Sequence, residues 1–479
     1  MKKITLILVL LLLAQATACG GSTTATDTTA SSGADTASAE ESTYLFTQEY
    51  AGDTIRVLNI DNIFSMHCVI DTKETNGETL NDTMYNAVRR IEDEMGITWK
   101  EDNIDLQKDF PTIVPRLILS GDDQYEIIYE NTRDLYTYSE QGYYYNLLDY
   151  NAIQLNEDWW LSDYNDYNMV GGKLYTAMGY SHLAVIDAIS CLWFNQSMMV
   201  DLGLDLPYDA VRDGKWTLDM LRTYIKSAAN LNGEDAFAWK DEGSCIWGIS
   251  MPSNTGTNWT RPLGEQIVDI SGDGKLTITA GTERFYDACD KVASILGATD
   301  GSVYMGHFNG DDKPGSYINC FEVQRSLFGC SEVCKANRMR NLDFDFGVLP
   351  YPKYDEAQER YYSSVSYPAS GVSIPVTCTD PARSAVVGDA INYIFYEDVW
   401  PTFRTVTLES KNLRNDNSIE MLQIVLNSIY PNICHIYGVG TSLNDVLSAS
   451  MRSGDAQAAS KLAAYRQQIE DDIKALNER

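Results

Sequence analysis

The chain has 479 residues, of which 44% are hydrophobic and 22% are charged, and a formal net charge of −32. This length is too great for one average core, so the sequence predicts two lobes or domains, each with a sizeable interior. The strong acidity argues against nucleic-acid binding, because a phosphate backbone is bound by clusters of Lys and Arg.

The N-terminus carries a predicted export and anchoring signal. Lys2-Lys3 precedes an apolar run from Ile4 to Ala14, which is too short to span a bilayer stably. The run leads into Ala16-Thr17-Ala18-Cys19, and small residues before a Cys in this position resemble a bacterial lipobox. We therefore predict a signal peptide over 1–18 and diacylation of Cys19, which anchors a protein to a membrane without spanning it. An ordinary signal peptide with an incidental Cys is the alternative.

The segment after Cys19 is a predicted tether. Residues 20–42 are Gly, Ser, Thr, Ala, Asp and Glu, with no large apolar side chain. Such a segment buries too little surface to offset the entropy of ordering, so 19–43 is expected to be flexible.

Predicted strands and helices alternate after the tether. Strands are expected at 54–60, 97–100 and 125–129, with a helical pattern at 110–119. Another helix is predicted between Thr79 as N-cap and Gly96, and its apolar stripe consists of Leu80, Met84, Ala87, Val88, Ile91 and Met95. This alternation predicts a parallel α/β sheet, in which ligands bind beyond the carboxyl ends of strands.

The stretch from Met169 to Asn195 has the most specific pattern in the chain. It contains a predicted turn at Gly171-Gly172, a strand at 173–177, a loop, and a short apolar run at 191–194. A Gly-Leu element at Gly203-Leu204 and a helix start at Trp216-Thr217 follow. As an ordered series, these features resemble the family 1 extracellular solute-binding proteins of the maltose-binding-protein type. Those proteins are the sugar-capturing subunits of ABC importers.

The resemblance implies an α/β, two-lobed periplasmic-binding-protein-like fold of class II. Three hinge crossings would join the lobes, and the ligand cleft would lie between them. The expected first lobe comprises 44–181 plus 372–428, and the expected second lobe comprises 182–371 plus 429–479.

Two further patterns concern metal and disulfide chemistry. Residues 269–274 resemble the front of a calcium loop, but Ala280 stands where an EF-hand needs a bidentate Glu, so a hairpin into 276–278 is favoured. Nine cysteines remain after Cys19, an odd number without a CxxC pair, and most are interpreted as small buried hydrophobic residues. The four histidines show no metal-ligand spacing, so neither a metal centre nor a cofactor is predicted.

The common catalytic signatures are missing from the sequence. It contains no HExxH, GxSxG, P-loop or GxGxxG motif. Carboxylates are so numerous that the sequence alone leaves a glycosidase pair open, and it is the family resemblance that argues against an enzyme.

Candidate sugar-contacting residues are chosen near crossings and strand ends. Sugars are bound by planar hydrogen-bonding side chains and by aromatic faces. By resemblance, the candidates fall on cleft-facing loops of both lobes, and each could instead be a surface or structural residue. They are Asn131, Arg133, Asp187, Trp259, Arg261, Ser331, Glu332, His435 and Tyr437. The pair Trp159-Trp160 is interpreted as packing onto its own lobe and is left out.

The sequence therefore predicts a monomeric binding protein held by lipid on the extracytoplasmic face of a bacterial membrane. It would capture a carbohydrate, expected to be an oligosaccharide, and deliver it to the permease of an ABC transporter. A surface glycoside hydrolase and a polysaccharide-binding adhesin are the alternatives. A peptide or another polar solute also remains open as the ligand.

Overall fold

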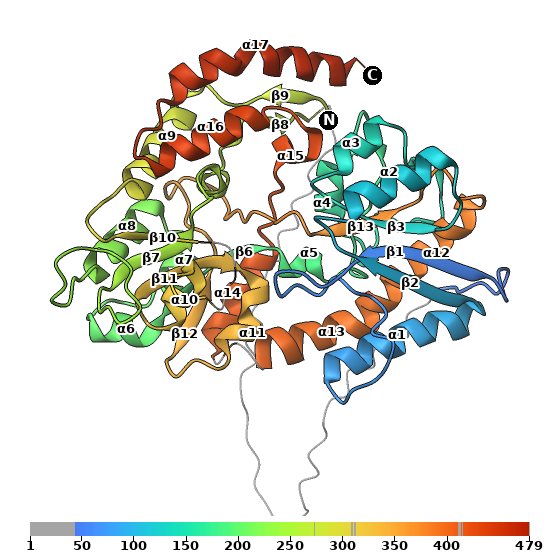
Figure 1. Ribbon diagram of the computed structural model, residues 1–479, viewed down its shortest axis with the longest axis horizontal. Coiled ribbons are helices and arrows are strands. Elements are labelled where there is room, and N and C mark those ends of the chain that lie inside the picture. Colours follow the sequence, from blue (N-terminus) through green and yellow to red (C-terminus); the bar gives the residue numbers. More distant parts are fainter. Residues whose placement is uncertain are drawn as a thin grey trace, which may run out of the picture. The chain divides into compact units, whose positions relative to one another are not determined.

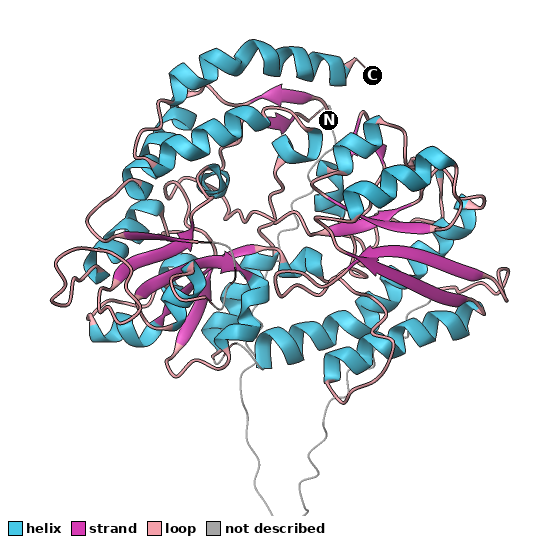
Figure 2. Cartoon of the chain, in the orientation of Figure 1, coloured by secondary structure: helices cyan, strands magenta, loops and turns pink. Residues whose placement is uncertain are grey.

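Two separate groups of strands organise the chain (Figure 2). The computed structural model describes residues 44–478, apart from 273, 308–309, 311–312, 411–412 and 414. The predicted signal peptide, Cys19 and the tether lie outside the described residues. No helix in the described part of the chain is long and apolar enough to cross a bilayer.

The first sheet has the strand order β13-β3-β1-β2. Its strands are β1 (Thr54–Ile60), β2 (Thr98–Ile104), β3 (Ile127–Asn131) and β13 (Ser370–Ser373). The first three are parallel, and β13 pairs with β3 in the antiparallel sense. Val57 and Leu58 of β1 are fully buried, as expected for a strand whose two faces are both covered.

Helices cover both faces of this sheet, and Figure 1 shows α1 and α2 on opposite sides of it. These helices are α1 (Thr79–Met95) and α2 (Phe110–Ser120). A third helix, α12 (Pro381–Ile394), contacts α1. The apolar stripe predicted for α1 is confirmed, since all six of its side chains are buried. Glu78 is the N-cap of α1, so the prediction of Thr79 was one residue late, while Gly96 ends the helix with a φ of 67°.

The second sheet has the order β10-β7-β11-β6-β12. Its strands are β6 (Ser190–Asn195), β7 (Trp247–Pro252), β10 (Val303–Gly306), β11 (Ser326–Glu332) and β12 (Phe346–Leu349). Helices α8 (Leu218–Ala228) and α10 (Tyr317–Glu322) both contact β7 and β11. A Cβ atom at Gly248 of β7 would lie 2.1 Å from the carbonyl oxygen of Ile225 in α8, so this helix packs closely because the strand carries a glycine.

Shorter elements connect and flank the two sheets. Near the first sheet are α3 (Leu135–Glu140), η1 (Leu147–Asp149), α4 (Ser162–Tyr167), β4 (Met169–Val170) and β5 (Lys173–Leu174). The following elements are α5 (Ala184–Asp187), α6 (Gln196–Asp201), α7 (Tyr208–Arg212), η2 (Thr257–Trp259), η3 (Arg261–Leu263), β8 (Val268–Ile270), β9 (Leu276–Ile278), α9 (Glu283–Leu296), η4 (Val333–Lys335) and α11 (Ala336–Met339). The C-terminal part contains η5 (Phe395–Val399), α13 (Trp400–Thr402), η6 (Phe403–Ser410), α14 (Asp416–Leu426), α15 (Ile433–Tyr437), α16 (Thr441–Arg452) and α17 (Ala458–Asn477).

The described chain passes from one sheet to the other in three places. It leaves β3 and reaches β6 by way of the separate β4–β5 hairpin, it leaves β12 for β13, and it leaves α12, which contacts α1, for α14, which contacts β12. The last passage runs through η5 and η6, which have π-helical geometry. The C-terminal helices α15 and α16 follow this passage.

Several local sequence predictions are confirmed. The hairpin favoured over a calcium loop is present as the antiparallel pair β8 and β9. Gly171 and Gly172 turn between β4 and β5 with φ values of 58° and 73°, which glycine adopts without strain. All nine cysteines in the described residues are buried and unpaired.

Trp159 and Trp160 are anchored to α12, whose residues the sequence analysis assigned to the same lobe as the pair. Both indole Nε1 groups donate to the carboxylate of Asp389 in α12, at 3.1 and 2.7 Å. The Asp389 carboxylate is buried and also accepts a hydrogen bond from the amide Nε2 of Gln154 at 3.0 Å. The tryptophan pair is therefore a structural anchor.

Candidate ligand-binding site

A polar cavity of about 380 Å³ lies at the carboxyl end of β11. The end of β11, the residues around η2, the segment 364–367 and α16 form its walls. Amide side chains line it at Asn254, Asn258, Asn432 and Asn444. Hydroxyl side chains line it at Ser190, Thr255, Thr257, Ser331, Ser364, Ser366 and Ser448. The wall can therefore both donate and accept hydrogen bonds over most of its surface.

Arg261 is the cation in the wall of this cavity. It opens η3 and is 5% exposed. Its Nε donates to the Ser364 hydroxyl at 3.1 Å, and its Nη2 donates to the Asn258 amide oxygen at 2.7 Å. Burial lowers the pKa of Arg261 to about 10, so the guanidinium remains protonated at neutral pH.

Glu332 supplies a carboxylate at the end of β11. One of its oxygens accepts from the Ser331 hydroxyl and the other from the Ser366 hydroxyl, both at 3.1 Å. The antiparallel pairing of β11 with β6 stops here, where Glu332 lies opposite Ser190. The strand end thus carries Ser331 and Glu332 to the cavity wall.

The opposite wall comes from α15 and α16. On α16, Asn444 and Ser448 are four residues apart and face η2, where Thr257 donates to Asn444 at 2.9 Å through its hydroxyl and to the Ser448 hydroxyl at 3.3 Å through its backbone N–H. A Cβ at Gly256 would lie 2.4 Å from the Ser448 Cα, so glycine is what permits this approach. His435 on α15 is near Arg261, and desolvation together with the charge of Arg261 lowers its pKa.

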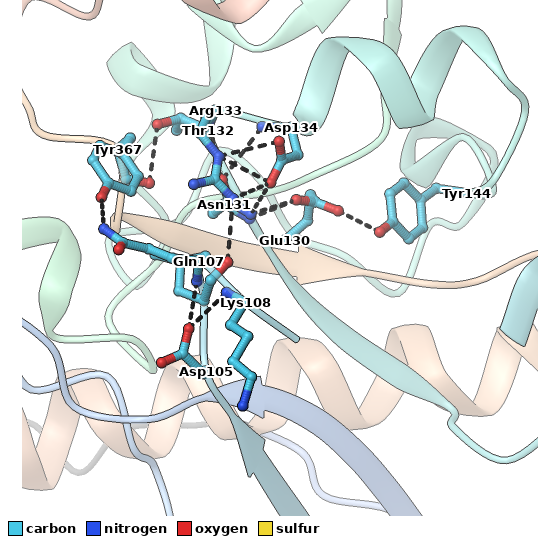
Figure 3. A network of polar contacts seen from close by, with 11 residues as sticks. Asp105, Gln107, Lys108, Glu130, Asn131, Thr132, Arg133, Asp134, Tyr144 and Tyr367 are labelled. Carbon is cyan, nitrogen blue, oxygen red and sulfur yellow. Dashed lines mark hydrogen bonds and ion pairs between the residues drawn. The ribbon is translucent and has the colours of Figure 1, made fainter. Parts of the chain in front are cut away.

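Tyr367 links the cavity to the carboxyl end of β3 (Figure 3). Its hydroxyl accepts a hydrogen bond from the amide Nε2 of Gln107 at 2.8 Å. The guanidinium carbon of Arg133 lies 5.3 Å from the centre of the Tyr367 ring, and the hydroxyl of Thr132 donates to the Tyr367 carbonyl at 3.4 Å. Through Tyr367, the cavity wall therefore includes a contact with the first sheet.

The structure brings four of the nine predicted site residues together. Arg261, Ser331, Glu332 and His435 line the cavity. Arg133 does not line it but contacts Tyr367, which does. Ligand contact by these residues stays a prediction. The other four, Asn131, Asp187, Trp259 and Tyr437, are buried outside the lining.

Asn131 and Asp187 form internal hydrogen bonds where cleft-facing side chains were expected. Asn131 is the last residue of β3, and its amide group bonds Glu130 and Asp134 while its oxygen accepts from the Arg133 N–H (Figure 3). The Asp187 carboxylate accepts from both the backbone N–H and the ring Nδ1 of His67, each at 2.7 Å. Both side chains thus hold turns of the chain in place.

Trp259 and Tyr437 also face protein instead of the cavity. The Trp259 ring packs edge-on against Tyr351, with the two ring centres 5.0 Å apart. Trp259 is 1% exposed. Tyr351, which Trp259 contacts, is itself part of the cavity lining. Tyr437 is 3% exposed, and its hydroxyl donates to the carbonyl of Met169. Both are large aromatic side chains that fill space behind the wall.

Sequence reasoning missed several lining residues. Ser364 and Tyr367 lie a few residues before the expected lobe boundary at 371–372, which is the one signal that pointed toward them. Asn444, Asp445 and Ser448 lie on a C-terminal helix whose sequence carries no motif. Their presence in the wall depends on the tertiary contact of α16 with η2.

A second cavity, of about 600 Å³, lies between the loop after β1 and α11. Several of its polar groups already have protein partners. The Asn62 oxygen accepts from the N–H groups of Cys68 and Val69, and Asp71 forms ion pairs with Lys73 and Arg89. Asn62, Asp71 and Lys73 are thus engaged by the protein, whereas hydroxyl side chains are the most frequent groups in the wall around Arg261 and Glu332.

Comparison with known proteins supports an assignment at the level of the fold. No family model matches the sequence, and no curated protein does either. Among solved structures, the chain is similar to a cyclo/maltodextrin-binding protein complexed with maltotetraose, with 13% identity, a TM-score of 0.59, and coverage of 88% of this chain and 97% of that one. It is also similar to the GacH receptor of Streptomyces glaucescens, with 12% identity, a TM-score of 0.56, and coverage of 88% and 99%.

A third similar structure is the ABC substrate-binding protein Lmo0181 from Listeria monocytogenes in complex with cycloalternan. The identity is 12%, the TM-score is 0.55, and the alignment covers 90% of this chain and 99% of that one. The chain has the fold of ABC substrate-binding proteins. The two-lobed α/β class expected from sequence is thereby confirmed, and the alignments extend over nearly the whole of each relative.

Proposed function

We propose that this protein captures a carbohydrate in the cavity at the end of β11 and delivers it to the permease of an ABC importer. The observation that carries the proposal is the cavity wall itself, in which amides, hydroxyls, Arg261 and Glu332 converge. Such groups match the alternating donors and acceptors of sugar hydroxyls. Support comes from the fold, because the similar structures include complexes with maltotetraose, acarbose and cycloalternan.

The size of the cavity favours a short saccharide. Its volume of about 380 Å³ is near the lower end of the roughly 300–1,000 Å³ typical of small-molecule sites. A short oligosaccharide is the ligand that we propose, with its hydroxyl groups at Ser331, Glu332 and Ser448.

Closure of two lobes around the sugar is the proposed signal to the permease. We assign the first sheet and its helices to one lobe and the second sheet to the other, with the three passages between the sheets as hinges. We assign 416–426 to the second lobe as well, because α14 contacts β12; the sequence analysis assigned these residues to the first. Tyr367 would contact the ligand, and its contact with Arg133 would connect the bound ligand to the first lobe. A permease can recognise closure only if the sugar binds the closed state better.

The proposed location is the extracytoplasmic face of the cell membrane. Its support is in the sequence: the signal-like residues 1–18, the lipobox ending at Cys19, and the polar composition of 19–43. We propose that the anchored protein works as a monomer that binds its ligand without cleaving it. Mass spectrometry of the mature N-terminus tests the anchor, with a diacylated Cys19 as the expected result.

Calorimetric titration with short oligosaccharides tests the capture of sugar, and chromatography of the recovered sugar tests for cleavage. We expect binding with an unchanged sugar, and at least 10-fold weaker binding by Glu332→Gln, because a hydrogen bond to a charged group contributes about 1.5–3 kcal/mol. The control is Glu470→Gln, an exposed carboxylate on α17 paired with Arg466. Equal affinity of both variants would refute the site, and hydrolysis of the sugar would indicate a glycosidase.

A further inference from the structure

Arg261 is a buried cation whose hydrogen bonds go to neutral groups. Its hydrogen bonds within the protein go to the amide oxygen of Asn258, three residues earlier in the chain, and to the hydroxyl of the distant Ser364. No ion pair joins it to any Asp or Glu that the structure describes. Arg338, by contrast, is more exposed and forms an ion pair with Glu322 at 2.7 Å.

The guanidinium of Arg261, which belongs to the cavity lining, has more donors than its two hydrogen bonds to the protein use. Arginine has five N–H donors, and two of those of Arg261 are engaged by Ser364 and Asn258. The remaining three belong to Nη1, with two, and Nη2, with one. Two adjacent nitrogens with free N–H groups form the fork that binds a carboxylate through two parallel hydrogen bonds.

A buried charge without a partner is unfavourable, and an anion in the ligand would relieve this. A neutral hydroxyl can accept hydrogen bonds from the guanidinium but carries no charge to compensate it. The rest of the wall argues for a single negative group, because Glu332 and Asp445 also line the cavity and would repel further anions. Their carboxylate oxygens are suited to accept hydrogen bonds from hydroxyls.

We propose that the captured carbohydrate is acidic, with one carboxylate, as in a uronic acid unit, held by the fork of Arg261. This inference rests on the proposed function and defines the chemical class of its ligand. The carboxylate would lie against Nη1 and Nη2 of Arg261, and the neutral hydroxyls would lie toward Glu332 and Ser331.

The experiment is calorimetric titration of the purified full-length chain at pH 7 with matched probes. Di- and trisaccharides that contain glucuronate or galacturonate are each compared with their methyl ester and with the neutral parent sugar. We expect at least one acidic saccharide to bind at least about 30-fold more tightly than its methyl ester, because loss of one partner of a buried charge pair has an effect of this size or more.

Variants then assign the effect to Arg261. Arg261→Gln should abolish the preference for acid over ester, and Arg261→Lys should retain a part of it, since lysine keeps the charge but lacks the fork. Arg325→Gln is the matched control: Arg325 is also buried, but its Nε and Nη1 donate to the carbonyls of Cys245 and Lys240. This control should keep the full preference. If Arg261→Gln does not fold, the comparison of acid with ester in the unchanged protein still decides the question.

The outcomes separate this inference from the proposed function. Equal or tighter binding of neutral sugars and esters would overturn the acidic ligand while leaving sugar capture intact. Binding of small carboxylates that are not sugars, with the same dependence on Arg261, would support the fork and refute carbohydrate capture. Absence of binding by every acidic probe would overturn the inference.

Discussion

The contact between His67 and Asp187 leads to a prediction about stability and pH. Asp187 was expected to contact ligand, but its carboxylate accepts two hydrogen bonds from His67 and is 1% exposed. We expect Asp187→Ala to lower the free energy of unfolding by about 3–5 kcal/mol, the range for removal of one partner of a buried charged pair. The affinity for ligand should change little, because Asp187 does not line the cavity.

The pH dependence follows from the ring of His67. Burial alone would lower the pKa of His67, but the charge of Asp187 and the hydrogen bond to it outweigh burial, so the pKa is raised above 6.5. A raised pKa means that the folded state favours the protonated ring. Its stabilising contribution is full below about pH 6.5 and is lost as pH rises through the folded pKa. About 1.5 kcal/mol is expected, near the lower end for charged hydrogen bonds, since 26% of the His67 side chain is exposed.

Urea unfolding of the unchanged protein and of His67→Asn, each from pH 5.5 to 9, measures this contribution as a difference between two curves. Asn can still donate a hydrogen bond to Asp187 but does not titrate, so the difference should shrink as pH rises. His307→Asn is the control at an exposed histidine. Parallel curves for the unchanged protein and His67→Asn would refute the reasoning, as would an Asp187→Ala variant of normal stability that no longer binds ligand.

Three further predictions concern the cavity and its supports. Tyr367→Ala should weaken ligand binding in calorimetry by about 10-fold through loss of the aromatic wall, with a stability change of about 1 kcal/mol from the lost bond to Gln107, and unchanged affinity would contradict this role. Gly256→Ala should displace α16 from η2 and reduce both affinity and thermal stability, because the new Cβ would lie 2.4 Å from the Ser448 Cα; normal values of both would show that the wall adapts. Asp389→Ala should destabilise the protein to urea by about 3–5 kcal/mol, since four donors lose a buried acceptor, and a loss below 1 kcal/mol would argue against this anchor.

The sequence predicted elements whose pattern is local. The apolar stripe of α1, the turn at Gly171-Gly172 and the β8–β9 hairpin follow from periodicity and turn chemistry over a few residues. The structure confirms all three. They could be predicted because residues close together in the sequence determine each of them. The resemblance over 169–195 further predicted the class of fold, since it depends on the order of several such elements.

The candidate site was predicted less well, because side-chain direction and distant contacts decide it. The third strand was expected to end at Tyr129 but continues to Asn131, which places the Asn131 side chain inside the protein. Ser448 lines the cavity only because α16 meets Gly256, almost 200 residues earlier in the chain. Arg261 could be selected from sequence, but only the fold shows that none of the described carboxylates forms an ion pair with it.

A crystal structure of the protein with the tightest-binding saccharide tests the central claim most directly. We predict the sugar in the cavity between β11 and α16, within hydrogen-bond distance of Glu332 and Arg261. A sugar bound instead in the cavity near Asn62 and Arg340, with the cavity at β11 left to solvent, would contradict the account.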